Sequence, residues 1–378
     1  MQDKDTVLKT KRLFQGNTTF YTATMKSDKL YTLSQADIIK ISKDDQSLYE
    51  GIQRELNKSK VNNIVDYLSQ PDATFPNSII LNLNVESNIS PNKDGSFNLT
   101  FKESTKAFFI LDGQHRLEGL HKAGKVFDLP VSIFINLSKP QQQEIFTRIN
   151  SEQTNINPSI TVLKERDSPY DTPRKFAVNL AIAFGEDHES SWYQKIKYTG
   201  KKDIYSDNGI ISIKAFYEPI LNLIYDDQDY YLVRAGLINN KNITQNLRCN
   251  YDTSNYIFWD FYKNNDFVTV YKILDNYFSA IRQTFSKEYS NYSEKRKYLE
   301  NMPASLLQKT TGYTALMSLF KDLYIKGKAE GDLSKSFFLN ALYILKPLDG
   351  KINSDNYPAS GLQSSKQLYE TFKRHLNI

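Results

Sequence analysis

The chain has 378 residues, which is room for two domains and a sizeable hydrophobic core. Hydrophobic residues make up 40% and charged residues 24%, an ordinary globular composition, and no apolar run approaches membrane-spanning length. The formal net charge of +5 permits nucleic-acid contact through local patches but excludes a densely basic DNA-coating protein. The single cysteine, Cys249, excludes an internal disulfide framework and a cysteine-rich zinc site, and it fits a reducing cytoplasm, where we expect the protein to act.

The first 167 residues alternate between strand and helix patterns. Strand patterns occur near the N-terminus (residues 1–30) and at residues 79–85, 97–101, 108–111 and 131–135. Helical patterns occur at residues 52–68 and 114–123, after Ser138, and after Asn157-Pro158. This alternation predicts an α/β domain over residues 1–167, with residues 79–135 in one mixed sheet.

After Asp167 the pattern changes, and alternation typical of strands becomes scarce. Long helical periodicities occupy residues 174–184, 209–225, 255–285, 311–327 and 335–345. Loops are expected around residues 185–208 and 226–256, which are rich in Gly, Asp, Asn and Tyr. The pattern therefore predicts a mainly α-helical C-terminal domain over residues 168–378, with Pro169 and Pro173 marking the boundary.

The most informative segment is the junction after the apolar run 108–111. Asp112-Gly113 marks a sharp turn, and Leu117 and Leu120 then recur at helical spacing. The start of a helix offers free backbone N–H groups and a partial positive charge, which together favour an anion. The junction therefore predicts an anion-binding site at the beginning of this helix.

Each polar residue of the junction also has a purely structural interpretation. Asp112 could serve as a turn or cap carboxylate, His115 as a packing side chain, and Arg116 as half of a surface ion pair. Five small or polar residues in succession are, however, a poor way to build a core. The concentration of residues 112–116 at one turn favours a functional site.

Several blocks of the sequence resemble the DGQHR-domain family in the order that a whole-domain match would have. Residues 112–116 carry the complete signature. The other similar blocks are residues 54–68, residues 145–150 with 157–159, and residues 307–316. The best-known branch of the family is DndB, associated with DNA phosphorothioation, and its wider relatives have the ParB nuclease-like fold. The resemblance implies a ParB-like mixed sheet in the N-terminal domain.

The resemblance also implies a function. It indicates a DNA-associated protein of a DNA-modification or phage-defence locus, which binds DNA and regulates transcription of the locus. A nucleoside triphosphate with magnesium, bound or hydrolysed at the signature loop, is part of the hypothesis. The alternative is a non-enzymatic DNA-binding or ligand-sensing module with a structural anion site. The sequence leaves the oligomeric state open, a homo-oligomer included, and assigns no metal ligands.

Candidate residues follow from the signature and its flanking blocks. As catalytic candidates, Asp112 would orient a metal or a water, and His115 would act as a hydrogen-bond partner or proton shuttle. The candidate ligand-binding residues are Arg54, Gly113, Gln114, Arg116, Arg148 and Asn150. We expect Arg54, Asp112, His115, Arg116 and Asn150 to converge in one cavity. Gln114 and Ile149 stand where ParB relatives carry carboxylates.

A basic segment of the C-terminal domain is the candidate DNA-binding surface. Its lysines are Lys195, Lys197, Lys201 and Lys202, and its aromatic residues are Trp192, Tyr193 and Tyr198. Lysines suit phosphate contacts, and aromatic rings between them suit base stacking. The alternatives are a solvated loop without DNA contacts and a second basic cluster at residues 295–297.

Overall fold

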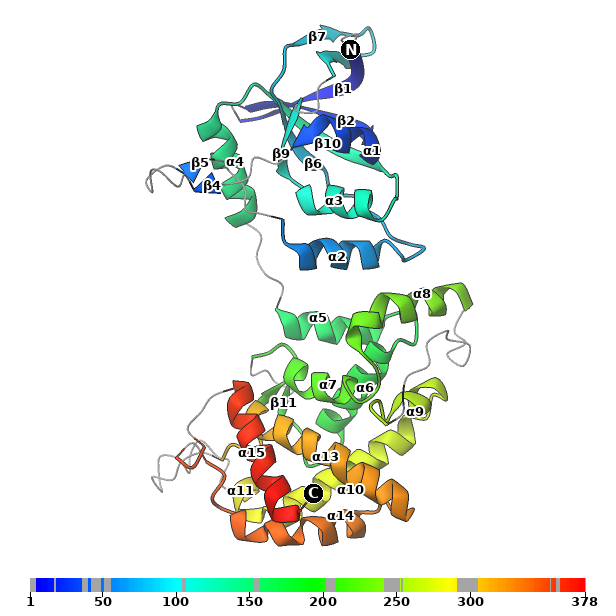
Figure 1. Ribbon diagram of the computed structural model, residues 1–378, viewed down its shortest axis with the longest axis vertical. Coiled ribbons are helices and arrows are strands. Elements are labelled where there is room, and N and C mark those ends of the chain that lie inside the picture. The colour runs from blue at the N-terminus through cyan, green and yellow to red at the C-terminus, as the bar shows by residue number, and fades with distance from the viewer. Residues whose placement is uncertain are drawn as a thin grey trace. The chain divides into compact units, whose positions relative to one another are not determined.

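The computed structural model describes residues 5–16, 18–35, 40–41, 49–50, 56–103, 107–151, 157–201, 209–240, 252, 254–290, 305–353, 355–357 and 361–377. The chain forms two compact units, Met1–Asn155 and Ile156–Ile378 (Figure 1). The predicted boundary between residues 167 and 168 lies later in the chain, after α5 (Pro158–Lys164). Helix α5 packs against α7 (Ile213–Leu221), and its Val162 belongs to the core of the second unit.

The N-terminal unit is built on an 8-stranded mixed sheet with the order β3-β9-β6-β10-β2-β1-β8-β7. The strands are β1 (Asp5–Gln15), β2 (Thr18–Lys26), β3 (Ser34–Gln35), β6 (Ile79–Leu83), β7 (Ser87–Pro91), β8 (Phe97–Lys102), β9 (Phe108–Asp112) and β10 (Asp128–Ile135). Two pairs, β3 with β9 and β6 with β10, are parallel, and the other pairs are antiparallel. The predicted mixed sheet over residues 79–135 is therefore confirmed. A separate antiparallel pair joins β4 (Lys40–Ile41) to β5 (Tyr49–Glu50).

The unit also contains helices α1 (Ser27–Leu33), α2 (Lys58–Tyr67), α3 (Gln114–Lys122) and α4 (Lys139–Ser151). Of these, α1, α2 and α3 form layers on one face of the sheet, and α4 contacts β9. Leu30 of α1 and Leu117 of α3 share a core cluster with Ile79 of β6, so α1 and α3 cover that face. Helix α2 packs on α3, and Figure 1 shows α3 between α2 and the sheet.

The second unit is mainly helical. Its longer helices are α5, α6 (Pro173–Glu186), α7, α8 (Tyr230–Asn240), α10 (Phe267–Thr284), α13 (Thr310–Glu330), α14 (Lys335–Leu342) and α15 (Gly361–Leu376). Shorter pieces are η1 (Glu165–Asp167), η2 (Asp227–Asp229), α9 (Trp259–Lys263), α11 (Ser286–Ser290) and η4 (Tyr343–Leu348). The predicted fold class, an α/β N-terminal domain followed by a mainly α-helical C-terminal domain, is confirmed.

Aromatic rings fill the core of the helical unit. Trp192 lies edge-on to Phe216, with ring centroids 5.1 Å apart, and Phe216 stacks on Tyr313 at 4.5 Å. The buried hydroxyl of Tyr313 donates a hydrogen bond to the carbonyl oxygen of Phe216 at 2.8 Å. Aromatic pairs favour particular ring arrangements in addition to burying apolar surface, so these contacts orient α7 and α13 against each other.

Two sequence expectations for the helical unit are wrong. The stretch 255–285 is two helices, because Asn265 adopts a positive φ of 54° and Asp266 then caps α10 by accepting a hydrogen bond from the N–H of Thr269. The expected loop 226–256 contains α8, whose Val233 and Leu237 are one helical turn apart and both buried. The unit also holds a short parallel pair of β11 (Ile196–Lys197) and β12 (Ile211–Ser212).

Candidate functional site

The signature residues lie at the junction where β9 ends and α3 begins. Gly113 caps α3 with a φ of 102°, a backbone conformation that residues with a Cβ rarely adopt. A Cβ at this position would also collide with the Cδ1 atom of Ile79 and lie 3.2 Å from Arg116. Gly113 is thus required both by its dihedral angle and by the close approach of β6, as the sequence predicts for a strand-to-helix turn.

The next three residues point in different directions, because successive helical side chains are about 100° apart. Gln114 lines a cavity beside α1, His115 contacts the start of α2, and Arg116 contacts the segment before β6. His115 and Arg116 therefore join two neighbouring segments to the first turn of α3.

Arg116 acts as a clamp between α3, β9 and the segment before β6. Its guanidinium donates to the carbonyl oxygens of Asn77 at 2.7 Å and Ser78 at 3.2 Å, and it forms an ion pair with Asp112 at 2.8 Å. The Arg116 side chain is only 18% exposed. A planar guanidinium suits several acceptors at fixed angles, so this contact sets the geometry of the loop.

His115 joins α3 to the N-terminus of α2. The backbone N–H of Asn57 donates to Nε2 of His115 at 3.1 Å, so Nε2 is an acceptor and the neutral ring carries its proton on Nδ1. Burial, with a smaller effect from the ammonium of Lys60, lowers the pKa of His115 below its usual value of 6.5. At neutral pH the ring is therefore an uncharged link between the two helices.

Helices α2 and α3 lie side by side and run in the same direction. His115 contacts Asn57 at one end of the pair, and the ammonium of Lys122 donates to Asn62 at 2.8 Å farther along. Between these contacts, a Cβ on Gly119 would collide with Ile64, so the helices approach closely at that glycine. Both N-termini, each with a partial positive charge, are thus adjacent, and Lys60 lies in the first turn of α2.

A cavity of about 310 Å³ borders the other side of α3. Its walls come from α1, β3, β9 and α3, and include Gln114, Leu117 and Glu118. Tyr31 of α1 donates a hydrogen bond to Glu118 at 3.2 Å and stacks on His121 at a centroid distance of 3.8 Å. Burial and the neighbouring Glu118 raise the pKa of Tyr31, so its hydroxyl remains a hydrogen-bond donor at neutral pH.

The structure brings together part of the predicted site. Asp112, His115 and Arg116 belong to one junction, although His115 and Arg116 contact different elements. Arg54 and the side chain of Asn150 lie outside the described residues, so the convergence of all five residues stays a prediction. Arg148 is on α4 and forms an exposed ion pair with Glu144 at 2.7 Å.

The predicted DNA-binding segment has both inward-facing and solvent-facing residues. Trp192 is 0% exposed, so its expected role as a base-stacking ring is wrong: the ring belongs to the core. The ammonium of Lys195 donates to the carbonyl oxygen of Ser191 at 2.8 Å, and burial, with Arg282, lowers its pKa to about 8. Lys197 is half-buried and Lys201 is exposed. Lys202 and residues 295–297 lie outside the described part of the chain.

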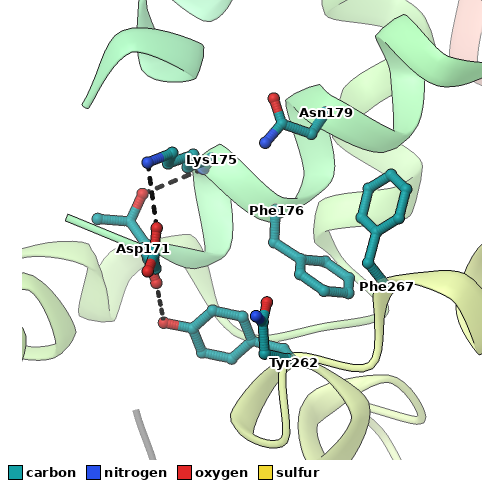
Figure 2. Close-up of a pocket in the computed structure, with 8 residues that line it drawn as sticks. Asp171, Lys175, Phe176, Asn179, Tyr262 and Phe267 are labelled. Carbon is teal, nitrogen blue, oxygen red and sulfur yellow. Dashed lines mark hydrogen bonds and ion pairs between the residues drawn. The ribbon is translucent and has the colours of Figure 1, made fainter. Parts of the chain in front are cut away.

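A second cavity of about 310 Å³ lies within the helical unit, between α6 and the corner formed by α9 and α10 (Figure 2). Phe176 and Asn179 line it from α6, and Tyr262 and Phe267 line it from the corner. The sequence analysis singled out none of these residues, because only the packing of distant helices brings them together.

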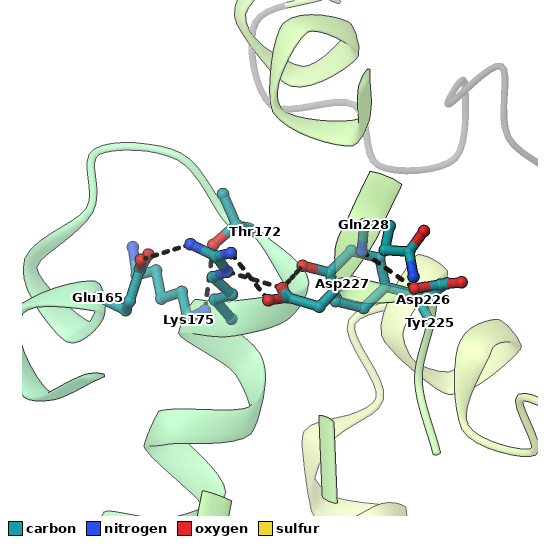
Figure 3. Close-up of polar contacts among 8 residues, drawn as sticks. Glu165, Thr172, Lys175, Tyr225, Asp226, Asp227 and Gln228 are labelled. Carbon is teal, nitrogen blue, oxygen red and sulfur yellow. Dashed lines mark hydrogen bonds and ion pairs between the residues drawn. The ribbon is translucent and has the colours of Figure 1, made fainter. Parts of the chain in front are cut away.

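A charged cluster beside the start of α6 was also missed from the sequence (Figure 3). Arg174 forms a bidentate ion pair with Asp227 at 2.8 and 2.9 Å and a further contact with Glu165 at 3.3 Å. Tyr225 donates to Asp227, and the guanidinium of Arg174 lies 3.5 Å from the ring centroid of Tyr230. Burial raises the pKa of Glu165. These contacts fasten η1 and α6 to η2, which is a structural role.

The fold and the site together define a two-unit protein whose α/β unit presents a strand-to-helix signature loop at two adjacent helix N-termini. The family model for DndB, described as DNA-sulfur modification-associated, matches residues 8–188. The matched segment contains the signature, the sheet from β1 onward and α6 of the second unit.

Comparison with solved structures finds the C-terminally truncated chromosome-partitioning protein ParB from Caulobacter crescentus, complexed with CTP-gamma-S. It is 14% identical, the TM-score is 0.23, and the match covers 58% of this chain and 88% of that chain. No curated protein matches the chain. Among the described residues, no helix has both the length and the apolar character needed to cross a membrane.

Proposed function

We propose that this protein is a DndB-like, DNA-associated component of a DNA-modification or phage-defence locus, and that it binds the phosphates of a nucleotide at the signature loop. The observation that carries the proposal is the pairing of the N-termini of α2 and α3, which lie within the segment matched by the DndB model. Regulation of the locus through DNA binding is part of the same proposal.

Electrostatics supports phosphate binding at this place. Backbone N–H groups in the first turn of a helix have no acceptor within the helix, and their partial charges attract anions. Two parallel helices with adjacent N-termini add their partial charges at this place, although the side chain of Asn57 already accepts from the N–H of Lys60, and the side chains of Lys58 and Lys60 add exposed positive charge. His115 holds the two helix starts together, so the N–H groups are preorganised before a phosphate arrives.

The geometry favours binding over turnover. Asp112 is the carboxylate that hydrolysis would need, but its Oδ2 is already paired with Arg116, which in turn holds the segment before β6. A carboxylate in this position neutralises and orients the arginine. We therefore propose a nucleotide-binding or nucleotide-sensing module, and magnesium-dependent hydrolysis remains the second candidate.

Two lysines at opposite ends of the α2–α3 pair test the phosphate site. Replacing Lys60 by alanine is expected to weaken nucleoside triphosphate binding about tenfold or more, because a hydrogen bond to a charged group contributes roughly 1.5–3 kcal/mol. Calorimetric titration of the full chain with ATP, GTP, CTP and UTP, with and without magnesium, measures the change.

Lys122→Ala is the matched control. Lys122 belongs to the same helix pair but lies in the last turn of α3, away from the paired N-termini. Its removal should leave triphosphate affinity unchanged. If Lys60→Ala binds as tightly as the wild type, or if no triphosphate binds the wild type, the proposed phosphate site is wrong.

DNA binding is proposed to be mainly electrostatic and to involve the solvent-facing Lys201. Each phosphate contact contributes about 0.9 to the slope of log affinity against log salt concentration for duplex DNA. Lys201→Ala should therefore flatten that slope by about one contact, measured by fluorescence anisotropy over a salt series. Lys328→Ala, an exposed lysine near the end of α13, is the control. An unchanged slope for Lys201→Ala would place the DNA surface elsewhere.

A further inference from the structure

Aromatic rings form part of the lining of the cavity in the helical unit. Phe176 lies edge-on to Tyr262 at a centroid distance of 5.8 Å and edge-on to Phe267 at 5.7 Å. Tyr262 is anchored because its hydroxyl donates to the carbonyl oxygen of Asp171 at 2.8 Å. The three rings give the cavity an apolar part, and their edge-on contacts favour this arrangement.

The charged groups at the rim of the cavity neutralise each other. Lys175 donates from its ammonium to the carbonyl oxygen of Ser168 at 2.9 Å and forms an ion pair with Asp171 at 3.1 Å. A cation that is already paired gives the cavity little attraction for a free anion. The cavity therefore favours a ligand whose bound part is uncharged, in contrast to the phosphate site of the N-terminal unit.

Two carboxamides, those of Asn179 and Asn265, line the cavity. Asn179 of α6 is half-buried and Asn265 of the α9–α10 corner is exposed, and neither side chain forms a hydrogen bond to another residue that the structure describes. Figure 2 shows Asn179 and the aromatic residues arranged around a common space. A carboxamide offers an acceptor and two donors, which match a donor and acceptor pair on a heterocycle.

We propose that this cavity binds a nucleobase, as part of a free nucleoside or as an exposed base of single-stranded DNA. A base is flat, uncharged and apolar on its faces, and its edge carries hydrogen-bond donors and acceptors. Aromatic rings pack against such faces, and an asparagine carboxamide pairs with an adenine edge. The volume of about 310 Å³ is at the small end of ligand pockets, as a single base with its sugar requires.

Titration of the full chain tests this proposal. Adenosine, guanosine, cytidine and thymidine are titrated separately and followed by ligand-observed NMR, and a short single-stranded oligonucleotide is compared with a blunt duplex of the same sequence. At least one nucleoside should bind. If the single strand binds more tightly than the duplex, the ligand is an exposed base of DNA. If the single strand binds as tightly as the duplex or more weakly, the ligand is a free nucleoside.

Variants separate this site from the phosphate site. Asn179→Ala should weaken nucleoside binding about tenfold, in line with the worth of a bidentate base contact, while triphosphate binding that depends on Lys60 is retained. Asn340→Ala, an exposed asparagine on α14, should change neither. The fluorescence of Trp192 and Trp259 reports whether Asn179→Ala disturbs folding. If it does, Asn265→Asp tests the same cavity, because the substitution leaves the side-chain volume almost unchanged. The proposal is overturned if neither the nucleosides nor the single strand bind. It is also overturned if the variant at Asn179 or Asn265 binds the nucleoside as tightly as the wild type.

Discussion

Gly113→Ala is expected to destabilise the N-terminal unit by roughly 2–5 kcal/mol. The positive φ of 102° costs a residue with a Cβ about 1–2 kcal/mol, and forcing a methyl group against buried Ile79 adds about 1–3 kcal/mol. The sum is large compared with the roughly 5–15 kcal/mol that stabilises a whole domain. Binding at the signature loop should be lost together with the turn.

The two units can be followed separately, because both tryptophans, Trp192 and Trp259, lie in the helical unit. Gly113→Ala should lower the stability of the sheet, measured by amide hydrogen exchange in β6 and β9. The unfolding of the helical unit, followed by tryptophan fluorescence, should be unchanged. Gly124→Ala separates the two causes, since Gly124 also has a positive φ, 62°, but has nothing within 4 Å of its added Cβ. Equal effects of the two substitutions would rule out the collision with Ile79.

Local sequence patterns predicted the elements around the signature. Asp112-Gly113 correctly predicts a turn, and Leu117 and Leu120 correctly predict the buried face of α3. Both signals depend only on neighbouring residues, because the conformational freedom of glycine and helical periodicity are local properties. The break at Asn265 also has a local signal in the run Asn264-Asn265-Asp266, but the helical periodicity on either side concealed it.

Contacts between distant segments could not be predicted in the same way. The carbonyl oxygens that hold Arg116 belong to Asn77 and Ser78, which no local pattern connects to the signature. The inward orientation of Lys195 likewise depends on Ser191 and on the packing of the helical unit. A basic, aromatic segment has the same composition whether its side chains face DNA or the core, so composition alone could not distinguish the two.

The parallel packing of α2 and α3 gives the signature a role that its residue types do not reveal. A histidine beside a glycine turn suggests a proton shuttle, but the structure uses Nε2 of His115 as an acceptor for the N–H of Asn57. Gly119 was the local clue to close packing, since a glycine inside a helix costs stability and commonly has a packing reason. Its partner Ile64 became known only from the fold.

Arg116→Ala is expected to destabilise the N-terminal unit by roughly 2–4 kcal/mol and to abolish triphosphate binding. The change leaves two carbonyl oxygens and the carboxylate of Asp112 without their partner in a largely buried position, and each such loss costs about 1–3 kcal/mol before relaxation. Arg116→Lys should recover neither property fully, because an ammonium cannot reproduce the planar fork. Thermal unfolding by circular dichroism, with calorimetric titration below the transition, measures both. Unchanged stability in Arg116→Ala would rule out the clamp.

Asp112→Asn then distinguishes a binding module from a metal-dependent enzyme. Asparagine keeps an oxygen that accepts from Arg116, so the loss of stability should be below about 1 kcal/mol, within the range of one ordinary hydrogen bond. If Asp112 only orients Arg116, removing its negative charge beside an anion site should strengthen triphosphate binding, with or without magnesium. If Asp112 instead holds a magnesium ion, the same substitution should weaken binding only when magnesium is present. We expect the first result, because the clamp already engages the carboxylate.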